Sequence, residues 1–304
     1  ATLPCGEVVA VKVRYPEIDK ALMADLGPSR IGITVAKVMA PGAEVEGFVD
    51  ELRERFLEEC DYEHEAARQQ RFAEIYAGDE TIVVPEVHGA FCGRRVLTTT
   101  FVCGQSFDDF LAADPPQHAR NTFGEALFSF YLGTLFRHGI YHADPHPGNF
   151  LFLPASAGSA PRLALLDYGC TRVFERSFVT KLARLTRAVH DDDREALEQS
   201  FVELEMRRSG RAGKRFDPEL ARKLLRAFYG PMLDDAVQPV RLGGGMDLAT
   251  AIRGKRRLMA LNLPREFLFL FRIRFGLLSV LARLDARANW GNLEQAAVSA
   301  CLDG

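Results

Sequence analysis

Short runs of β-branched residues in the first hundred positions predict strands. Residues 8–13 read Val-Val-Ala-Val-Lys-Val, and residues 81–87 and 95–102 are similarly rich in Val and Thr. Such runs are typical of strands in a partly buried sheet. Between the first two runs the pattern becomes helical, over residues 17–26 and 31–39 and in a charged helix that begins near Val45. We therefore expect a small β-rich region that contains a helical insertion.

After residue 105, apolar residues recur at helical spacing. Residues 120–139 are predicted to form a helix with Phe123, Leu127 and Phe130 on its core side, and Gly139 is suited to its C-cap. Further amphipathic helices are predicted at residues 178–189, 194–204, 218–229 and 263–284. The last of them is rich in Phe and Leu but contains four arginines, which disfavours a transmembrane helix. A buried core helix, or one at a membrane surface, fits this pattern better.

Length, charge and cysteine content narrow the functional classes. The chain has 304 residues, more than one domain usually contains, which favours two lobes. A net charge of -3 provides no electrostatic basis for binding nucleic acid. Six scattered cysteines without a C-x-x-C pair indicate reduced thiols, as in the cytoplasm. With no recognisable signal peptide and no long apolar run, we expect a cytoplasmic protein whose membrane contact, if present, is peripheral.

The run from His142 to Phe150, HADPHPGNF, has the spacing of a phosphoryl-transfer site. Asp144 precedes Asn149 by five residues, and Asp167 follows an apolar strand in the sequence LLDYG. Asp144 is suited to accept a proton from an attacking hydroxyl or to orient it, while Asn149 and Asp167 offer hard oxygen ligands for magnesium. The spacing matches the H-R-D-x-x-x-x-N and D-F-G motifs of protein kinases, with Ala in place of the Arg and Tyr in place of the Phe. The alternative is an ordinary Pro- and Gly-rich turn with solvated carboxylates.

Lys12 lies inside the first strand, where V-A-V-K closely matches the kinase V-A-I-K strand whose lysine holds the α- and β-phosphates. A buried ammonium group needs a partner, and the acids Glu59, Asp61 and Glu65 follow in a helical stretch. We favour Glu65 as that partner, as in the kinase Lys–Glu pair. Three alternatives stay open: Lys12 faces solvent, Asp61 caps a helix that begins at Tyr62, or the acids form a solvated helix face.

Two further segments complete the expected site. Residues 103–105, directly after Val102, are interpreted as a hinge whose backbone groups hold an adenine edge. After Gly169, fewer than ten residues precede the helix expected near Ser177. That length is too short for the platform on which protein kinases hold an extended peptide. We therefore expect the phosphoryl acceptor to be a small molecule, a lipid or water.

Together these motifs resemble the ABC1/ADCK/UbiB family of atypical kinases. The resemblance rests on V-A-V-K-V-R-Y-P, E-C-D-Y-E-H-E-A, H-A-D-P-H-P-G-N-F and L-L-D-Y-G. It implies an α+β, protein-kinase-like two-lobed fold, with a small β-rich N-lobe over residues 1–104 that carries the helical insertion, and a larger helical C-lobe over residues 105–304. It also implies ATP and Mg²⁺ as cofactors and an ATPase or kinase activity. That activity would support the biosynthesis of isoprenoid quinones such as ubiquinone, or lipid homeostasis, with quinone-like lipids or quinone-biosynthesis proteins as partners.

The resemblance also implies roles for individual residues. Lys12 and Glu65 match the phosphate-holding lysine and its helix partner, and Asp144 matches the catalytic-loop aspartate. The expected cofactor-binding residues are Lys12, Glu59, Asp61, Val102, Asn149 and Asp167, of which Asn149 and Asp167 are the metal ligands. The family's K-x-G-Q helix and Ala-rich nucleotide loop would precede Ala1, so Glu59 is expected to lack its lysine partner.

Two other functions stay open. A small-molecule phosphotransferase of the aminoglycoside-kinase type shares the H-x-D-x-x-x-x-N loop. Glu59 and Asp61, which match the E-x-D acids of the ABC1/ADCK/UbiB family, and the helical insertion argue against it. A non-catalytic nucleotide-sensing module would fit the missing nucleotide loop. The presence of Lys12, Asp144, Asn149 and Asp167 argues against that module.

Overall fold

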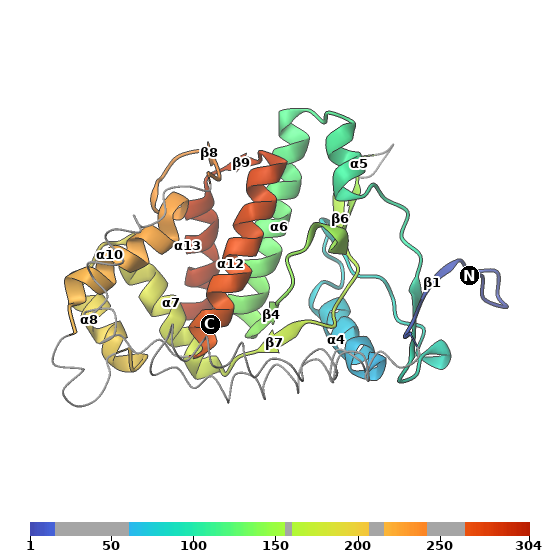
Figure 1. Ribbon diagram of the computed structural model, residues 1–304, viewed down its shortest axis with the longest axis horizontal. Helices are drawn as coiled ribbons and strands as arrows, with labels where there is room; N and C mark the ends of the chain where they lie inside the picture. The colour runs from blue at the N-terminus through green and yellow to red at the C-terminus, as the bar shows by residue number, and fades with distance from the viewer. Residues whose placement is uncertain (16–60, 156–159, 207–215, 242–264) are drawn as a thin grey trace, which may run out of the picture. The chain divides into compact units, whose positions relative to one another are not determined.

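The computed structural model describes residues 1–15, 61–155, 160–206, 216–241 and 265–304 (Figure 1). The expected helical insertion, the charged helix after it and Glu59 lie outside the described residues. The chain forms two compact units. The first comprises Ala1–Asp79, Val83–Cys103 and Ala164–Cys170, and the second comprises Glu80–Ile82, Gly104–Leu163 and Thr171–Gly304.

Strands are concentrated in the first half of the described chain and helices in the second half (Figure 1). In chain order the elements are β1 (Val9–Val13), α4 (Tyr62–Ile75), β2 (Ile82–Val83), η2 (Gly89–Phe91), β3 (Val96–Thr100), α5 (Phe107–Ala112), α6 (Gln117–His138), β4 (Ile140–His142), η3 (Pro147–Asn149), β5 (Phe150–Leu153), β6 (Arg162–Leu165), β7 (Thr171–Val173), α7 (Arg176–His190), α8 (Arg194–Glu203), α10 (Pro218–Tyr229), η4 (Gly230–Leu233), β8 (Gln238–Pro239), α12 (Arg265–Leu284), β9 (Arg287–Ala288) and α13 (Trp290–Leu302). The strand orders of the sheets are β1-β3, β2-β6-β5, β4-β7 and β8-β9.

In the first unit, β1 pairs with β3 in antiparallel register, which confirms both predicted strands. Lys12 lies opposite Leu97 in this ladder, so the two side chains share one face of the sheet. Tyr62 and Ala66 of α4 form a buried cluster with Leu97. The packing of α4 against β3 therefore brings a helix beside the lysine-bearing face.

The predicted strand at residues 81–87 is much shorter in the structure. Only β2 is formed there, and Val87 makes a single isolated bridge with Thr99. Pro85 lies between them and has no backbone N–H to donate to a ladder. The prediction was therefore wrong in extent, because proline interrupts the run of β-branched residues.

Helix α6 is the central element of the second unit. Its side chains Phe123, Leu127 and Phe130 are at most 1% exposed, which confirms the predicted core side. The helix ends at Gly139, which has a φ of 67° and donates its N–H to Leu135 O. The predicted C-cap is confirmed, because this left-handed conformation is accessible to glycine at little cost. The chain then enters β4, which leads into the motif at residues 142–150.

Of the helices that follow, α7, α12 and α13 contact α6. The predicted helices at 178–189, 194–204, 218–229 and 263–284 correspond to α7, α8, α10 and α12, with bounds that agree within two residues. Both α12 and α13 contact α6, and α13 also packs on α7 (Figure 1). Among the helices of the described residues, none is long and apolar enough to cross a membrane.

Candidate active site

The side chains of Lys12 and Glu65 meet within the first unit. Lys12 Nζ lies 2.9 Å from both carboxylate oxygens of Glu65, whose side chain is only 2% exposed. The ammonium group also lies 5.1 Å from the centroid of the Tyr62 ring. Because β1 and α4 each fix one partner, the lysine is held in one orientation. The structure thus brings together the two residues that the sequence paired.

The loop around Asp167 supplies a second carboxylate to the same lysine. Asp167 Oδ2 accepts a hydrogen bond from Lys12 Nζ at 3.0 Å, and Asp167 Oδ1 accepts one from the Gly169 N–H at 2.9 Å. Tyr168 is fully buried, with its ring centroid 4.9 Å from that of Phe72 on α4. Packing of the tyrosine against α4 therefore anchors the loop that carries Asp167.

The electrostatics of this group favour a charged lysine. Burial alone would lower the pKa of Lys12, but the carboxylates of Asp167 and Glu65 outweigh that effect and raise it. Burial and the charge of Asp167 raise the pKa of Glu65, despite the opposing effect of Lys12. The two carboxylates therefore hold Lys12 in its charged form.

Asp144 and Asn149 lie within the second unit, on the loop between β4 and β5. Asn149 Nδ2 donates to Asp144 Oδ2 at 2.9 Å and to the Asp144 backbone carbonyl at 3.2 Å. His146 Nδ1 accepts from the Gly148 N–H at 3.0 Å at the start of η3. These local hydrogen bonds connect the two ends of the motif. Asn149 thus bonds Oδ2 of the Asp144 carboxylate, and Oδ1 is the carboxylate oxygen that Asn149 does not bond.

His142 is placed as a structural residue of this loop. Its side chain is fully buried, and its Nδ1 lies 3.2 Å from the hydroxyl of Tyr131 on α6. In β4, His142 pairs with Thr171 of β7. The strand is therefore held by its pairing with β7 and by the contact of the His142 side chain with Tyr131. The loop that carries Asp144 thus begins from a strand fixed to the helical core.

The expected hinge follows the end of β3. Val102 is half-buried and lies outside any strand, two residues after β3. In the second unit, the backbones of Gln105 and Phe152 exchange hydrogen bonds of 2.8 Å in both directions. Whether Val102 contacts an adenine base stays a prediction.

Asp61 has a clear local role. It is the N-cap of α4, where its side chain accepts from the Glu63 N–H at 3.1 Å, and it also lies 3.1 Å from Arg94 Nε. This is the capping alternative raised by the sequence. Nucleotide binding by Asp61 stays a prediction, and Glu59 lies outside the described residues.

The donor types in the two motifs fit a magnesium–nucleotide complex. Because Asn149 donates through Nδ2, its Oδ1 is the atom left to act as a ligand. Asp167 contributes a carboxylate, and Mg²⁺ prefers such hard oxygen ligands in company with phosphate oxygens. Lys12 supplies the fixed positive charge that phosphates need. The residues present are therefore chemically suited to ATP and Mg²⁺.

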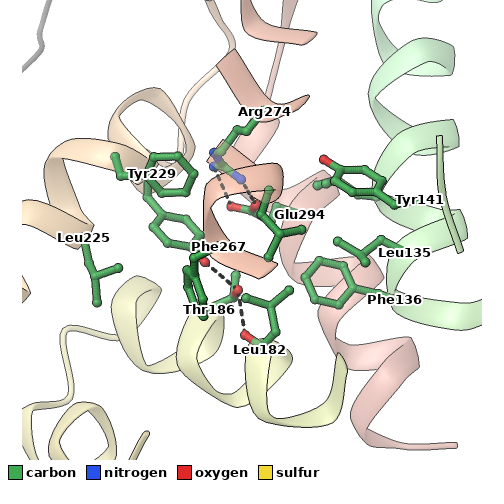
Figure 2. Close-up of a pocket in the computed structure, with 13 residues that line it drawn as sticks. Leu135, Phe136, Tyr141, Leu182, Thr186, Leu225, Tyr229, Phe267, Arg274 and Glu294 are labelled. Carbon is green, nitrogen blue, oxygen red and sulfur yellow. Dashed lines mark hydrogen bonds and ion pairs between the residues drawn. The ribbon is translucent and has the colours of Figure 1, made fainter. Parts of the chain in front are cut away.

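A small cavity in the second unit is not a second substrate site. Its volume is about 30 Å³, which accommodates one or two water molecules and no nucleotide. The residues that line it include Tyr141, Thr186, Tyr229, Phe267, Arg274 and Glu294 (Figure 2). The cavity therefore belongs to the packing of the helical core.

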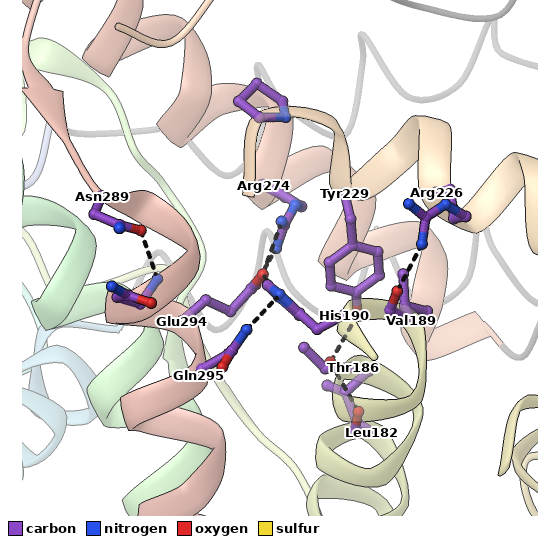
Figure 3. Close-up of polar contacts among 12 residues, drawn as sticks. Leu182, Thr186, Val189, His190, Arg226, Tyr229, Arg274, Asn289, Glu294 and Gln295 are labelled. Carbon is purple, nitrogen blue, oxygen red and sulfur yellow. Dashed lines mark hydrogen bonds and ion pairs between the residues drawn. The ribbon is translucent and has the colours of Figure 1, made fainter. Parts of the chain in front are cut away.

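A buried ionic cluster beside this cavity was not identified from the sequence. Arg274 of α12 makes hydrogen bonds of 2.6 and 3.4 Å to the carboxylate of Glu294 on α13, and His190 Nε2 of α7 lies 2.9 Å from Glu294 Oε2 (Figure 3). Gln295 Nε2 lies 3.2 Å from His190 Nδ1, which fits a ring proton on Nε2. The only sequence signal was an arginine within an apolar helix.

Comparison with known proteins extends these observations. The family model of the ABC1 atypical kinase-like domain matches residues 1–201. The atypical kinase coq-8, mitochondrial, of Caenorhabditis elegans is 30% identical over 197 residues, which cover 65% of this chain and 26% of that protein. The AarF domain-containing protein kinase 1 of Xenopus laevis is 27% identical over 65% of this chain and 38% of that protein. The chain thus spans about a quarter to two fifths of the length of these relatives.

A solved structure has a similar fold. The structure of the Rv3197–erythromycin complex from Mycobacterium tuberculosis superposes with a TM-score of 0.72 at 25% identity, covering 100% of this chain and 74% of that one. The α+β, kinase-like fold expected from the motifs is therefore confirmed. Because the family model covers about two thirds of the sequence, including Lys12, Asp144 and Asp167, the chain belongs to the ABC1 atypical kinase-like family.

Proposed function

We propose that this protein binds ATP with Mg²⁺ and catalyses phosphoryl transfer from it, as a kinase or an ATPase. The activity would support isoprenoid quinone biosynthesis or lipid homeostasis, with quinone-like lipids or quinone-biosynthesis proteins as partners and with peripheral membrane contact. The names of related proteins support the kinase assignment, since several are called atypical kinases. Some of these names also carry the terms mitochondrial or chloroplastic.

The contact between Lys12 and Glu65 carries this proposal. The Lys12 side chain is 44% exposed, yet its ammonium group bonds both oxygens of a carboxylate that is only 2% exposed. Burying that carboxylate costs free energy, which the ion pair with Lys12 and a hydrogen bond from the Tyr168 backbone offset. Such a pair is more readily explained as a device that fixes the ammonium group for a phosphate ligand.

Each residue then has one task. Lys12 binds the α- and β-phosphates, and Glu65 sets the position of its Nζ. Asn149 and Asp167 hold Mg²⁺, which neutralises phosphate charge when bound. Asp144 orients the acceptor hydroxyl and receives its proton, while the amide of Asn149 restricts the carboxylate to one orientation. Val102 and the residues after it hold the adenine, and Glu59 and Asp61 contribute to the nucleotide site.

The short segment after Asp167 supports an acceptor other than a peptide. Thr171–Val173 is already paired with β4, and α7 begins at Arg176. Both are committed to the fold of the second unit, which leaves little free chain for an extended peptide to dock on. A lipid, a small molecule or water is therefore the proposed acceptor.

The first test measures Mg-ATP affinity and phosphate release, with and without vesicles that contain a quinone-like lipid. We expect Asp167→Asn to lower the rate of phosphate release about a hundredfold or more, because it removes charge that acts on the metal. Lys12→Met should weaken nucleotide binding as well. Lys223→Met and Asp303→Asn make the same chemical changes at exposed positions and should behave as wild type.

The outcomes separate the three functions. Equal, weak nucleotide binding by wild type and Asp167→Asn would contradict catalysis. Tight binding without phosphate release under any condition would favour a nucleotide-sensing module. Lipid-independent transfer to a soluble alcohol would favour a small-molecule phosphotransferase.

A further inference from the structure

Helix α12 approaches the Asp144 loop at a glycine, Gly276. A Cβ atom at Gly276 would lie 2.5 Å from Pro145 Cγ, 3.5 Å from Cδ and 3.7 Å from Cβ. Real Cβ atoms essentially never approach a heavy atom closer than 3.0 Å. Glycine within a helix is less stable than alanine, so helix formation does not explain this residue. The close approach of Pro145, which follows Asp144, explains why position 276 has no side chain.

The position of α12 is fixed independently by Arg274, two residues before Gly276. Its guanidinium group bonds the buried Glu294 at 2.6 and 3.4 Å and lies 4.5 Å from the centroid of the Tyr229 ring (Figures 2 and 3). Residues two apart on a helix are rotated by about 200° around its axis, so they lie on nearly opposite sides. Contacts to α10 and α13 thus secure α12 on one side, while Gly276 meets Pro145 on the other.

Pro145 is well suited to transmit this contact to Asp144. Its ring fixes its own φ and restricts the backbone of the preceding residue to extended conformations. Asp144 is also bonded to Asn149 through both its carbonyl and its carboxylate. A displacement of Pro145 would therefore move the aspartate and strain the asparagine contact together.

We propose that Gly276 is a positioning residue for phosphoryl transfer, acting through its contact with Pro145 to set the place of the Asp144 carboxylate. This inference rests on the proposed function, since it concerns the loop assigned to the acceptor hydroxyl. Helix α12 then acts as a fixed support for the loop, and the absence of a Cβ at position 276 determines how far the loop can approach it.

The test compares Gly276→Ala with Gly133→Ala, a matched change in α6 where a Cβ would meet no other group within 4 Å. We expect Gly276→Ala to lower kcat for phosphate release at least tenfold and to leave KM for ATP within twofold, because a displacement of about 1 Å at a reacting group can cost a hundredfold in rate. Gly133→Ala should keep both parameters within twofold of wild type. A Gly276→Ala variant that behaves like Gly133→Ala would overturn the proposal.

A double variant tests the contact itself. Pro145→Ala removes Cγ and Cδ, so a Cβ at residue 276 would have only the 3.7 Å contact left. Gly276→Ala should then change kcat less than twofold relative to Pro145→Ala alone. An equal loss in both backgrounds would show that Pro145 does not transmit the effect. If Gly276→Ala does not fold, the double variant decides, since it should fold as Pro145→Ala does; a double variant that also fails to fold would contradict the proposal.

Amide hydrogen exchange separates this inference from the proposed function. If wild type releases no phosphate, the proposed function fails, but exchange at Asp144, Gly148 and Asn149 still reports the loop. Faster exchange in Gly276→Ala that returns to the Pro145→Ala rate in the double variant would support the positioning role. Unchanged exchange in Gly276→Ala would refute it.

Discussion

Gly139 determines where α6 ends and β4 begins. Its φ of 67° lies in the left-handed region, and a Cβ there would come within 2.9 Å of Phe174 O. The Phe174 N–H donates a hydrogen bond to Gly139 O at 2.8 Å. The Phe174 carbonyl therefore cannot move away from position 139 without disturbing that hydrogen bond. A side chain at this position would therefore meet both backbone strain and a steric obstacle.

Gly139→Ala should lower the free energy of unfolding by about 2 kcal/mol or more, because strain of about 1–2 kcal/mol adds to the contact with Phe174. Chemical denaturation followed by the fluorescence of Trp290, the single tryptophan, measures the change. Gly139→Asn adds the same Cβ but tolerates the left-handed conformation better. If Gly139→Asn were as stable as wild type, the steric contact would contribute nothing.

At the scale of elements, a single ionic cluster joins α7, α12 and α13. Arg274 and Glu294 are 8% and 1% exposed, and their carboxylate–guanidinium contact is reinforced by His190 (Figure 3). Replacing one member of such a pair leaves the other charge buried without compensation, whereas replacing both with apolar residues is often tolerated. The cluster therefore specifies how these helices meet more than it adds stability.

Glu294→Gln should destabilise the protein by about 3–5 kcal/mol at neutral pH, because the Arg274 charge loses its counterion. Urea denaturation measures this loss. The double variant Arg274→Met with Glu294→Leu should lose less than Glu294→Gln does. A double variant that is less stable than the single one would contradict this account of the pair.

The same cluster predicts how the stability difference varies with pH. Burial opposes ionisation of Glu294, but the charge of Arg274 and hydrogen bonds from His190 and Arg274 outweigh it and lower its pKa below 4.5. Tyr141 of β4 and Tyr229 of α10 also interact with it, and burial raises the pKa of both hydroxyls. The advantage of wild type over Glu294→Gln should be complete above about pH 4.5 and shrink as pH falls through the folded pKa of Glu294. An advantage that grew on acidification would contradict the prediction.

At the scale of the whole chain, the second unit extends beyond the residues matched by the family model. That match ends at residue 201, yet α13 packs on both α6 and α7. Trp290 is fully buried, with its ring centroid 5.2 Å from that of Phe128 and its Nε1 donating to Gln238 O at 2.8 Å. The C-terminal helix is therefore part of the core that supports β4 and the loop after it.

Trp290→Ala should destabilise the second unit by about 3–5 kcal/mol, because it leaves a large cavity that the surrounding side chains cannot fill. Circular dichroism during denaturation measures the loss. Trp290→Phe keeps most of the ring volume and should cost less. A loss below 1 kcal/mol for Trp290→Ala would show that α13 is not part of the cooperative core.

Most of the candidate site could be predicted from local sequence, but not all of its geometry. Spacing identified Asp144, Asn149 and Asp167, and the strand pattern identified Lys12. The capping role of Asp61 was one of several alternatives, because a carboxylate before a helix can cap it, bind a cation or face solvent. The structure shows the cap and the Arg94 contact that occupy this side chain. The bond between Lys12 and Asp167, 155 residues apart, had no sequence signal.

The sequence by itself determined the family, the kinase-like fold, the principal helices and the residue types of the H-A-D-P-H-P-G-N-F and L-L-D-Y-G motifs. The helices depend on periodicity within a few turns of chain, whereas the family and the fold followed from the resemblance of the motifs to those of known proteins. Tertiary structure alone decided that Arg274 pairs with Glu294 and that Gly276 lies against Pro145. Such contacts depend on how distant elements pack, and close packing makes one methyl group at a single position decisive.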